Sequence, residues 1–185
     1  MKSTKLQACG VLAGAVLVLA ASVTARAQQG PPKPGPEHKK LEYYAGKWTT
    51  ESEVKANPFG PAGKYTSKDD CGLFQGGFAV ICHSDGTGPA GPTKSVGILG
   101  YSSEDKVYTY YGIDNSGMIP TSVSKGSVTG DTWVYTDESK MGGKLVKSRY
   151  TIKQVSLTSY TSKWEMRGEG GAWTTLMEAK SSKAN

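Results

Sequence analysis

The chain has 185 residues, about the length of one domain, of which 37% are hydrophobic, 21% charged and 9% aromatic. This composition excludes a multi-pass membrane protein, a coiled coil and a highly charged disordered chain. The 22 basic residues exceed the 16 acidic ones, but they are spread along the chain instead of forming a stripe, so no nucleic-acid partner is indicated.

Residues 1–27 have the anatomy of a secretory signal peptide. Two lysines precede an apolar run over 8–21, and Ala25-Arg26-Ala27 is a small-x-small cleavage site. The run is shorter than the ~20 residues that a spanning helix needs, which disfavours an uncleaved membrane anchor. We therefore predict an exported protein, periplasmic or secreted, that begins near Gln28. Cleavage leaves 19 basic against 16 acidic residues, a net charge of +3.

The next residues predict a leader and a short helix. Residues 28–36 are rich in proline and glycine and predict a flexible leader. Residues 37–44 predict a helix, because Pro36 favours a helix start and Leu41 and Tyr44 share one face.

Everything after this helix predicts strands, because apolar and polar residues alternate between turn residues at intervals of eight to twelve. With no helix long enough to cover a sheet, the strands must bury one face against one another, in a barrel or a sandwich. Short connections favour an all-β, antiparallel, up-and-down barrel of about ten strands over residues 37–182. We expect strands over 48–54, 64–75, 78–84, 93–101, 106–113, 118–128, 131–136, 144–153 and 157–167, and a last strand after 171.

A hairpin joins the two cysteines that remain after cleavage. If Gly76-Gly77 is a two-residue turn, Cys71 and Cys82 lie directly opposite each other, within the Cα spacing of a disulfide. By this count they occupy a hydrogen-bonded site of the ladder. We predict a disulfide, as export favours, because two cysteines and a distant histidine fall short of a zinc site.

Aromatic residues of the second half gather on one side of the predicted sheet. A turn at Thr129-Gly130 sets Gly126 opposite Trp133. A turn centred on Val155 sets Tyr150 opposite Tyr160, and a turn over residues 168–171 sets Met166 opposite Trp173. These three strands place Lys147, Arg149, Lys163, Glu165, Glu178 and Lys180 on the outer face. The inner face predicts a cavity for a small apolar ligand, although side chains that simply fill the barrel are the alternative. The candidate ligand-binding residues are Tyr111, Trp133, Tyr135, Tyr150, Tyr160, Trp164, Trp173 and Met177.

Several segments together resemble one known family. Gly46-Lys47-Trp48 resembles the Gly-x-Trp signature of lipocalin-like barrels, in which the tryptophan closes one end. Together with residues 73–78, 96–101 and 174–178, it resembles the bacterial family known as domain of unknown function 1579, over residues 36–180. The resemblance implies a lipocalin-like barrel and no activity. The family's last strand often ends with an arginine, and here Lys180 stands nearby.

The resemblance gives Gly46 and Trp48 a structural role at the closed end of the barrel. A glycine before the first strand permits backbone angles that other residues avoid. We expect the Trp48 indole N–H to donate to a backbone carbonyl near Lys180.

No residue pattern identifies a catalytic site. His83, Ser84 and Asp85 point to alternate faces of a strand and cannot converge as a triad. Haem ligation by His83 would need an inward histidine, whereas alternation places it on the face of Ile81. We assign no catalytic residue, metal or cofactor, and a barrel isomerase or hydrolase is the alternative to a binding protein. The carboxylates of Asp69, Asp70, Glu165 and Glu178, and also His38, are expected to face solvent.

The strands around residues 102–105 are apolar on both faces. One face must therefore meet the N-terminal helix or a partner. The face of Leu99, Tyr108 and Tyr110 is a candidate homodimer or envelope-protein interface.

Overall fold

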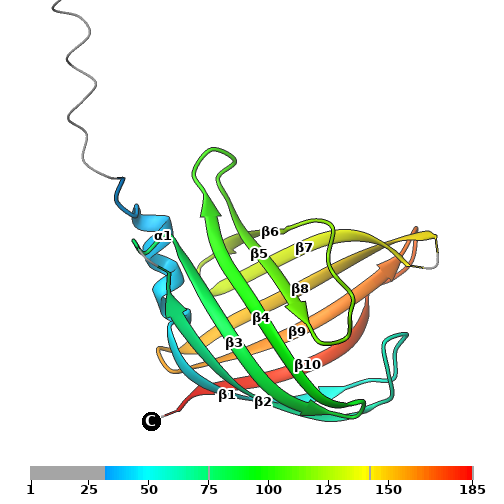
Figure 1. Ribbon diagram of the computed structural model, residues 1–185. Coiled ribbons are helices and arrows are strands. Elements are labelled where there is room, and N and C mark those ends of the chain that lie inside the picture. Colours follow the sequence, from blue (N-terminus) through cyan, green and yellow to red (C-terminus); the bar gives the residue numbers. More distant parts are fainter. Residues whose placement is uncertain (1–31, 75, 142, 185) are drawn as a thin grey trace, which may run out of the picture. The chain divides into compact units, whose positions relative to one another are not determined.

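The computed structural model describes residues 32–74, 76–141 and 143–184, so the predicted signal peptide and most of the predicted leader lie outside it. The compact unit that starts at Lys33 is a closed barrel of ten antiparallel strands (Figure 1). Each strand pairs with its neighbours in sequence, and the last pairs with the first. The prediction of an all-β, up-and-down barrel of about ten strands with a short N-terminal helix is confirmed.

An α-helix, α1 (Pro36–Lys40), continues into a 3-10 helix, η2 (Leu41–Tyr44), where one short helix is predicted. Among the described residues, no helix is long and apolar enough to cross a membrane. The strands are β1 (Gly46–Val54), β2 (Gly63–Leu73), β3 (Ala79–Gly88), β4 (Gly91–Ser102), β5 (Val107–Asp114), β6 (Ser124–Thr129), β7 (Thr132–Met141), β8 (Lys144–Ser156), β9 (Ser159–Gly168) and β10 (Thr174–Lys183).

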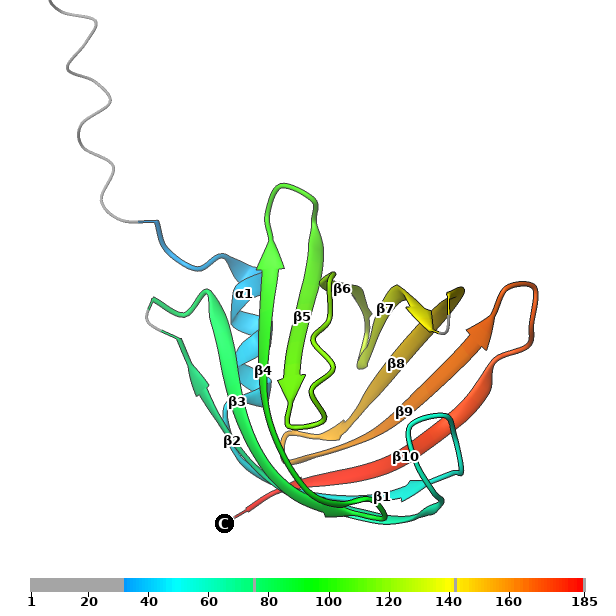
Figure 2. The same ribbon diagram turned by 45° about the vertical axis from the view of Figure 1, so that its right-hand side comes forward.

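The two helices lie at one end of the barrel, beside β3 and β4, and the β1–β2 and β9–β10 connections lie at the other (Figure 2). We call these the closed end and the open end. Leu41 and Tyr44 are buried at the closed end, as their spacing predicts. They join the hydrophobic core, which also contains Trp48, Cys71, Val80, Leu99, Tyr108, Trp133, Tyr135 and Ile152.

Trp48 is 2% exposed and follows Gly46, whose φ of +123° lies in the region that favours glycine. Its Nε1–H donates to the carbonyl of Tyr44 at 2.8 Å. The predicted acceptor near Lys180 is therefore wrong, because η2 ends next to the indole. The last strand instead contributes Lys183, whose Nζ lies 5.1 Å from the centre of the Trp48 ring.

The predicted disulfide between Cys71 and Cys82 is present, and the two residues are partners in the β2–β3 ladder. Their ladder site differs from the prediction, because the turn is wider than Gly76-Gly77. The Phe74 N–H donates to the carbonyl of Ala79 at 2.9 Å, so alternation along the ladder places the cysteines at a non-hydrogen-bonded site. Their Cα separation of 4.0 Å fits this closer pairing.

Two hairpins of the second half have registers that differ from the prediction. Gly126 pairs with Tyr135 and not with Trp133, because the β6–β7 turn lies one residue later. In the β8–β9 hairpin, Tyr150 pairs with Trp164. The predicted partner of Tyr150 was Tyr160, four residues away, and an even shift leaves every side chain on its predicted face.

The apolar face of β4 and β5 packs inside the barrel. Leu99 and Tyr108 are buried in the core, and the Tyr108 hydroxyl donates to the carboxylate of Glu37 in α1. The N-terminal helix therefore covers this face. The predicted partner interface through Leu99, Tyr108 and Tyr110 is wrong, since these side chains point inward.

His38 is also inside, contrary to the expectation that it faces solvent. Its Nδ1 accepts a hydrogen bond from the Gly35 N–H at 3.2 Å. Its ring contacts Phe78 and Tyr101 edge-on, with ring centres 5.1 and 5.4 Å away. The α-helix turns this histidine toward the hairpin that it covers.

Candidate functional site in the barrel interior

The inward side chains are not equally buried along the barrel. At the closed end, Trp48, Val80 and Trp133 are almost fully buried. Farther along the same face, Tyr150 and Trp164 are only partly buried. The packing of the barrel is therefore complete at one end and becomes looser toward the other.

Tyr110 marks the loose part of the interior. It pairs with the core residue Leu99, so its ring points inward, and yet it is 40% exposed. Burial nevertheless raises the pKa of its hydroxyl to about 12. An inward ring that water still reaches indicates that side chains do not fill the interior around it, and so we take this region as the candidate site.

Aromatic rings line both ends of this region. At the closed end, the rings of Tyr44 and Tyr108 pack against Trp133, with centres 5.2 and 4.7 Å away. At the open end, Phe59 of the β1–β2 loop stacks on Trp164 at 5.5 Å. The interior thus has an aromatic floor and an aromatic pair near its mouth.

Four buried polar atoms of the inner face have no hydrogen-bond partner within the described protein. They are Tyr44 Oη, Ser52 Oγ, Trp133 Nε1 and Tyr135 Oη. Burial raises the pKa of the Tyr44 and Tyr135 hydroxyls above their usual range, so both stay protonated. An unpaired buried polar group costs about 1–3 kcal/mol, and a water or ligand in contact with it would remove that cost.

The interior also holds the carboxylate of Asp69, contrary to the expectation that it faces solvent. Ser67 Oγ and Thr50 Oγ1 donate to it at 3.1 and 3.2 Å. The correction follows from alternation, because Asp69 lies two residues before Cys71 and shares its inward face.

Asp137 also faces the interior, although it is not among the predicted site residues. The hydroxyls of Ser124 and Ser148 donate to its carboxylate at 2.9 and 2.7 Å. It lies two residues after Tyr135, so the same alternation could have identified it. Together with Asp69, it gives the inner face two carboxylates held by hydroxyl groups.

The structure separates the predicted ligand-binding residues into two groups. Tyr111 lies outside, paired with Ile98, and its hydroxyl donates to the Pro120 carbonyl at 3.2 Å. Its inward assignment is wrong, since the neighbouring Tyr110 occupies the inner face. The residues that do face the interior are Trp133, Tyr135, Tyr150, Tyr160, Trp164 and Met177.

Trp173 also lies outside the barrel. Met166 pairs with Thr174 and not with Trp173, and this shift of a single residue reverses the face. The guanidinium groups of Arg149 and Arg167, both outward, lie 4.3 and 4.7 Å from the centre of the Trp173 ring. Trp173 therefore belongs to the outer surface.

Beside Trp173, Glu165 forms a buried ion pair on the outer face, contrary to the expectation of a solvated one. It is 5% exposed, and it accepts hydrogen bonds from Arg149 at 2.8 and 2.9 Å. Lys163 lies 3.0 Å away. Burial acts to raise the pKa of the Glu165 carboxyl, but the hydrogen bonds from Lys163 and Arg149 outweigh it and hold the pKa below its usual value.

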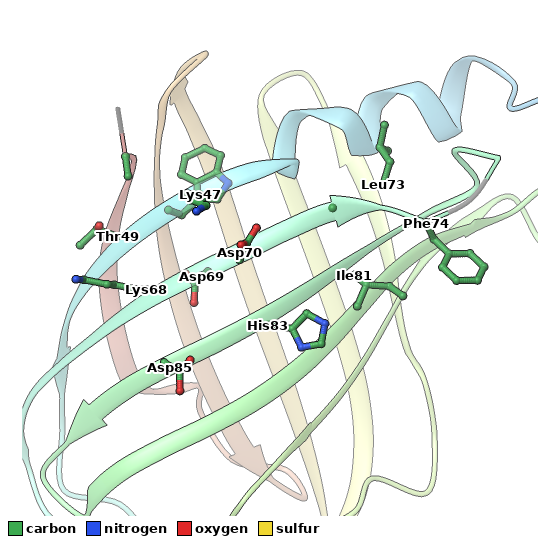
Figure 3. A pocket seen from close by; sticks show the side chains of 13 residues that line it. Lys47, Thr49, Lys68, Asp69, Asp70, Leu73, Phe74, Ile81, His83 and Asp85 are labelled. Atoms are coloured by element: carbon green, nitrogen blue, oxygen red, sulfur yellow. The ribbon is translucent and has the colours of Figure 1, made fainter.

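His83 is exposed on the outer face of β3, in line with Ile81 and Asp85 (Figure 3). It borders an open hollow of about 920 Å³ over β1 to β3. This position does not fit the alternative of a haem held by His83 among the interior aromatic residues. Within the described ranges, no group of three or more His, Cys, Asp or Glu side chains could hold a metal ion.

Comparison with known proteins supports the fold but names no activity. The family described as "Protein of unknown function (DUF1579)" matches residues 33–183. Among curated proteins, none matches the chain at a significant level.

Two solved structures share the architecture. The crystal structure of Rv2717c from M. tuberculosis has 16% identity and a TM-score of 0.57, over 82% of this chain and 99% of that one. The S-type phycobiliprotein lyase CPES from Guillardia theta has 13% identity and a TM-score of 0.53, over 80% of this chain and 93% of that one. At these identities the likeness shows the fold alone.

Proposed function

Because the chain belongs to the family described as protein of unknown function (DUF1579), whose name supplies no activity, we propose a function from the barrel itself. The protein binds one small ligand with a substantial apolar part inside the barrel, without catalysing a reaction on it. The ligand lies between the aromatic floor at Trp133 and the aromatic pair of Phe59 and Trp164.

One observation carries the proposal, namely the inward and yet 40% exposed ring of Tyr110. A barrel filled by its own side chains would bury this ring as fully as it buries Leu99. The unpartnered hydroxyl of Tyr135 and indole N–H of Trp133 support the same conclusion, because a ligand can supply their missing partners. Such a pocket, mostly apolar with a few directed polar groups, is typical of small-molecule sites.

We also propose that the protein acts outside the cytoplasm. The N-terminal residues have the pattern of a cleaved signal peptide, and the Cys71–Cys82 disulfide suits an oxidising compartment. Intact-mass measurement of the protein expressed with its own N-terminus tests this. We expect a chain that begins near Gln28, and a chain that still begins at Met1 would contradict export through cleavage.

A fluorescence titration with diphenylhexatriene, a neutral apolar probe that emits when shielded from water, tests ligand binding. We expect saturable one-to-one binding that Trp164→Ala weakens by about tenfold, since an aromatic contact contributes about 1 kcal/mol beyond its burial. Trp173→Ala is the matched control, because it removes the same side chain from the outer face, and it should bind like the wild type.

The outcomes separate the barrel from other binding surfaces. Folding of both variants is checked by their thermal melting. Weaker binding only in Trp173→Ala would place the probe on the outside. The absence of saturable binding to the folded wild type would contradict the proposed function.

A further inference from the structure

Away from the strand ends, the charged side chains on the inner face are acidic. Asp69 and Asp137 lie in mid-strand and point inward, as their hydroxyl partners show. On the described strands, the basic residues at inward positions are at strand ends. They are Lys144, exposed at the first residue of β8, and Lys183, which lies over Trp48 at the closed end.

The two carboxylates have hydroxyl partners instead of cationic ones. Asp69 accepts from Thr50 and Ser67, and Asp137 accepts from Ser124 and Ser148. Within the described part of the chain, neither forms an ion pair with a Lys, Arg or His side chain. Both carboxylates are partly buried, so a cation that enters the barrel can pair with them in a way that no side chain there provides.

The charge of Asp69 reaches the aromatic lining. It contributes to the raised pKa of the hydroxyls of Tyr110, Tyr150 and Tyr160, although burial is the largest cause in each case. The carboxylate of Asp69 therefore lies close enough to these three phenol groups for its charge to affect them.

Glycines on the inner face let tyrosine rings lie flat along the barrel wall. A methyl group at Gly126 would come 2.6 Å from the ring of Tyr135, and one at Gly112 would come 2.5 Å from the hydroxyl of Tyr110. A ring in this position covers the glycine with one face, and the ring of Tyr110 remains 40% exposed. The negative faces of aromatic rings attract cations, quaternary ammonium groups in particular.

We infer that the barrel ligand is an organic cation, an amine or quaternary ammonium group on an apolar body, with its charge at Asp69 and the neighbouring tyrosine rings. This inference rests on the proposed function, since it names the chemical class that the same cavity takes. Fatty acids and other anionic amphiphiles are disfavoured, because they would bring a second negative charge beside Asp69.

Three probes of one shape test the charge preference. They are diphenylhexatriene, its trimethylammonium derivative and its propionic acid derivative. We expect the cationic probe to bind at least about tenfold more tightly than the neutral one, and the anionic probe to bind more weakly than both. In Asp69→Asn, the cationic probe should lose most of its advantage over the neutral probe, whose own affinity stays unchanged.

Asp70→Asn is the matched control, because Asp70 is the next residue in sequence and faces outward. It should leave all three affinities unchanged. Asp137→Asn provides a second variant in case Asp69→Asn does not fold, which its melting temperature shows. It should likewise weaken the cationic probe alone.

Each outcome decides the inference. Equal binding of the cationic and neutral probes, or tightest binding of the anionic one, would overturn the cationic class while leaving a ligand-binding barrel. Failure of all three probes to bind would instead contradict the proposed function. A preference for the cation that persists in both Asp69→Asn and Asp137→Asn would show that the interior carboxylates do not select the ligand.

Discussion

The closed end and the open half of the barrel share one inner face but are built differently. At the closed end, the indole of Trp48 has a hydrogen-bond partner, a covering cation and a helix against it. In the open half, Tyr110 remains 40% exposed and Trp164 is only partly buried. From this difference we infer that the closed end contributes most to stability, whereas the open half is available for a ligand.

The largest expected effect is the loss of stability in Trp48→Ala. Removing a fully buried tryptophan costs about 3–5 kcal/mol, a large part of a domain's stability. Trp164→Ala should cost less, because Trp164 is only partly buried. Urea denaturation measures both. If Trp48→Ala melts like the wild type while Trp164→Ala unfolds the protein, the two ends have been assigned the wrong way round.

The disulfide should have the next largest effect. The Cys71–Cys82 bond closes a loop with a sequence separation of 11, and a loop of this size stabilises a fold by about 2–3 kcal/mol. The double variant Cys71→Ala and Cys82→Ala should lower the free energy of unfolding measured in urea by this amount and leave diphenylhexatriene binding to the folded protein unchanged. Weaker probe binding with no loss of stability would contradict the division between the two regions.

A smaller and pH-dependent effect is expected from Glu165, which lies on the outside of the open half. Its pKa is lowered in the folded state, so its contribution is present above the unfolded-state pKa of about 4.3 and is lost as the pH falls through the folded-state value. Glu165→Gln should lower the free energy of unfolding by about 1–3 kcal/mol at neutral pH. It should also make this free energy fall less steeply as the pH is lowered.

The exposed Glu178 supplies the comparison for this experiment. Glu178→Gln should leave the stability unchanged, because Glu178 is exposed and has no ion-pair partner among the described residues. If the stability of the two variants depends on pH in the same way, the ion pairs of Glu165 with Arg149 and Lys163 do not stabilise the open half of the barrel.

Alternation and turn residues predict the barrel and most of its inner face. Tyr150 and Trp164 keep their predicted faces although the β8–β9 register is four residues off, because a strand repeats its faces every two residues. The disulfide is equally predictable, since a count outward from the Gly76-Gly77 turn pairs the cysteines. An even error in register, as in the β8–β9 hairpin, does not change which residues are inside.

The remaining errors have two separate causes. Trp173 lies outside because its hairpin is shifted by one residue, and an odd shift reverses the face. Asp69 has a polar side chain on an inner face, so an assignment by hydropathy places it in solvent. Alternation counted from Cys71 and from Tyr135 would place Asp69 and Asp137 inside, and the hydroxyl partners of Asp69, Thr50 and Ser67, agree with that placement.

The most direct test is a crystal structure of the protein with the trimethylammonium derivative of diphenylhexatriene bound. We predict electron density for the probe inside the barrel, with its apolar body against Tyr110 and Trp164 and its ammonium group beside Asp69. Density in the outer hollow beside His83, with an interior that excludes the probe, would contradict the assignment of the barrel as the binding site.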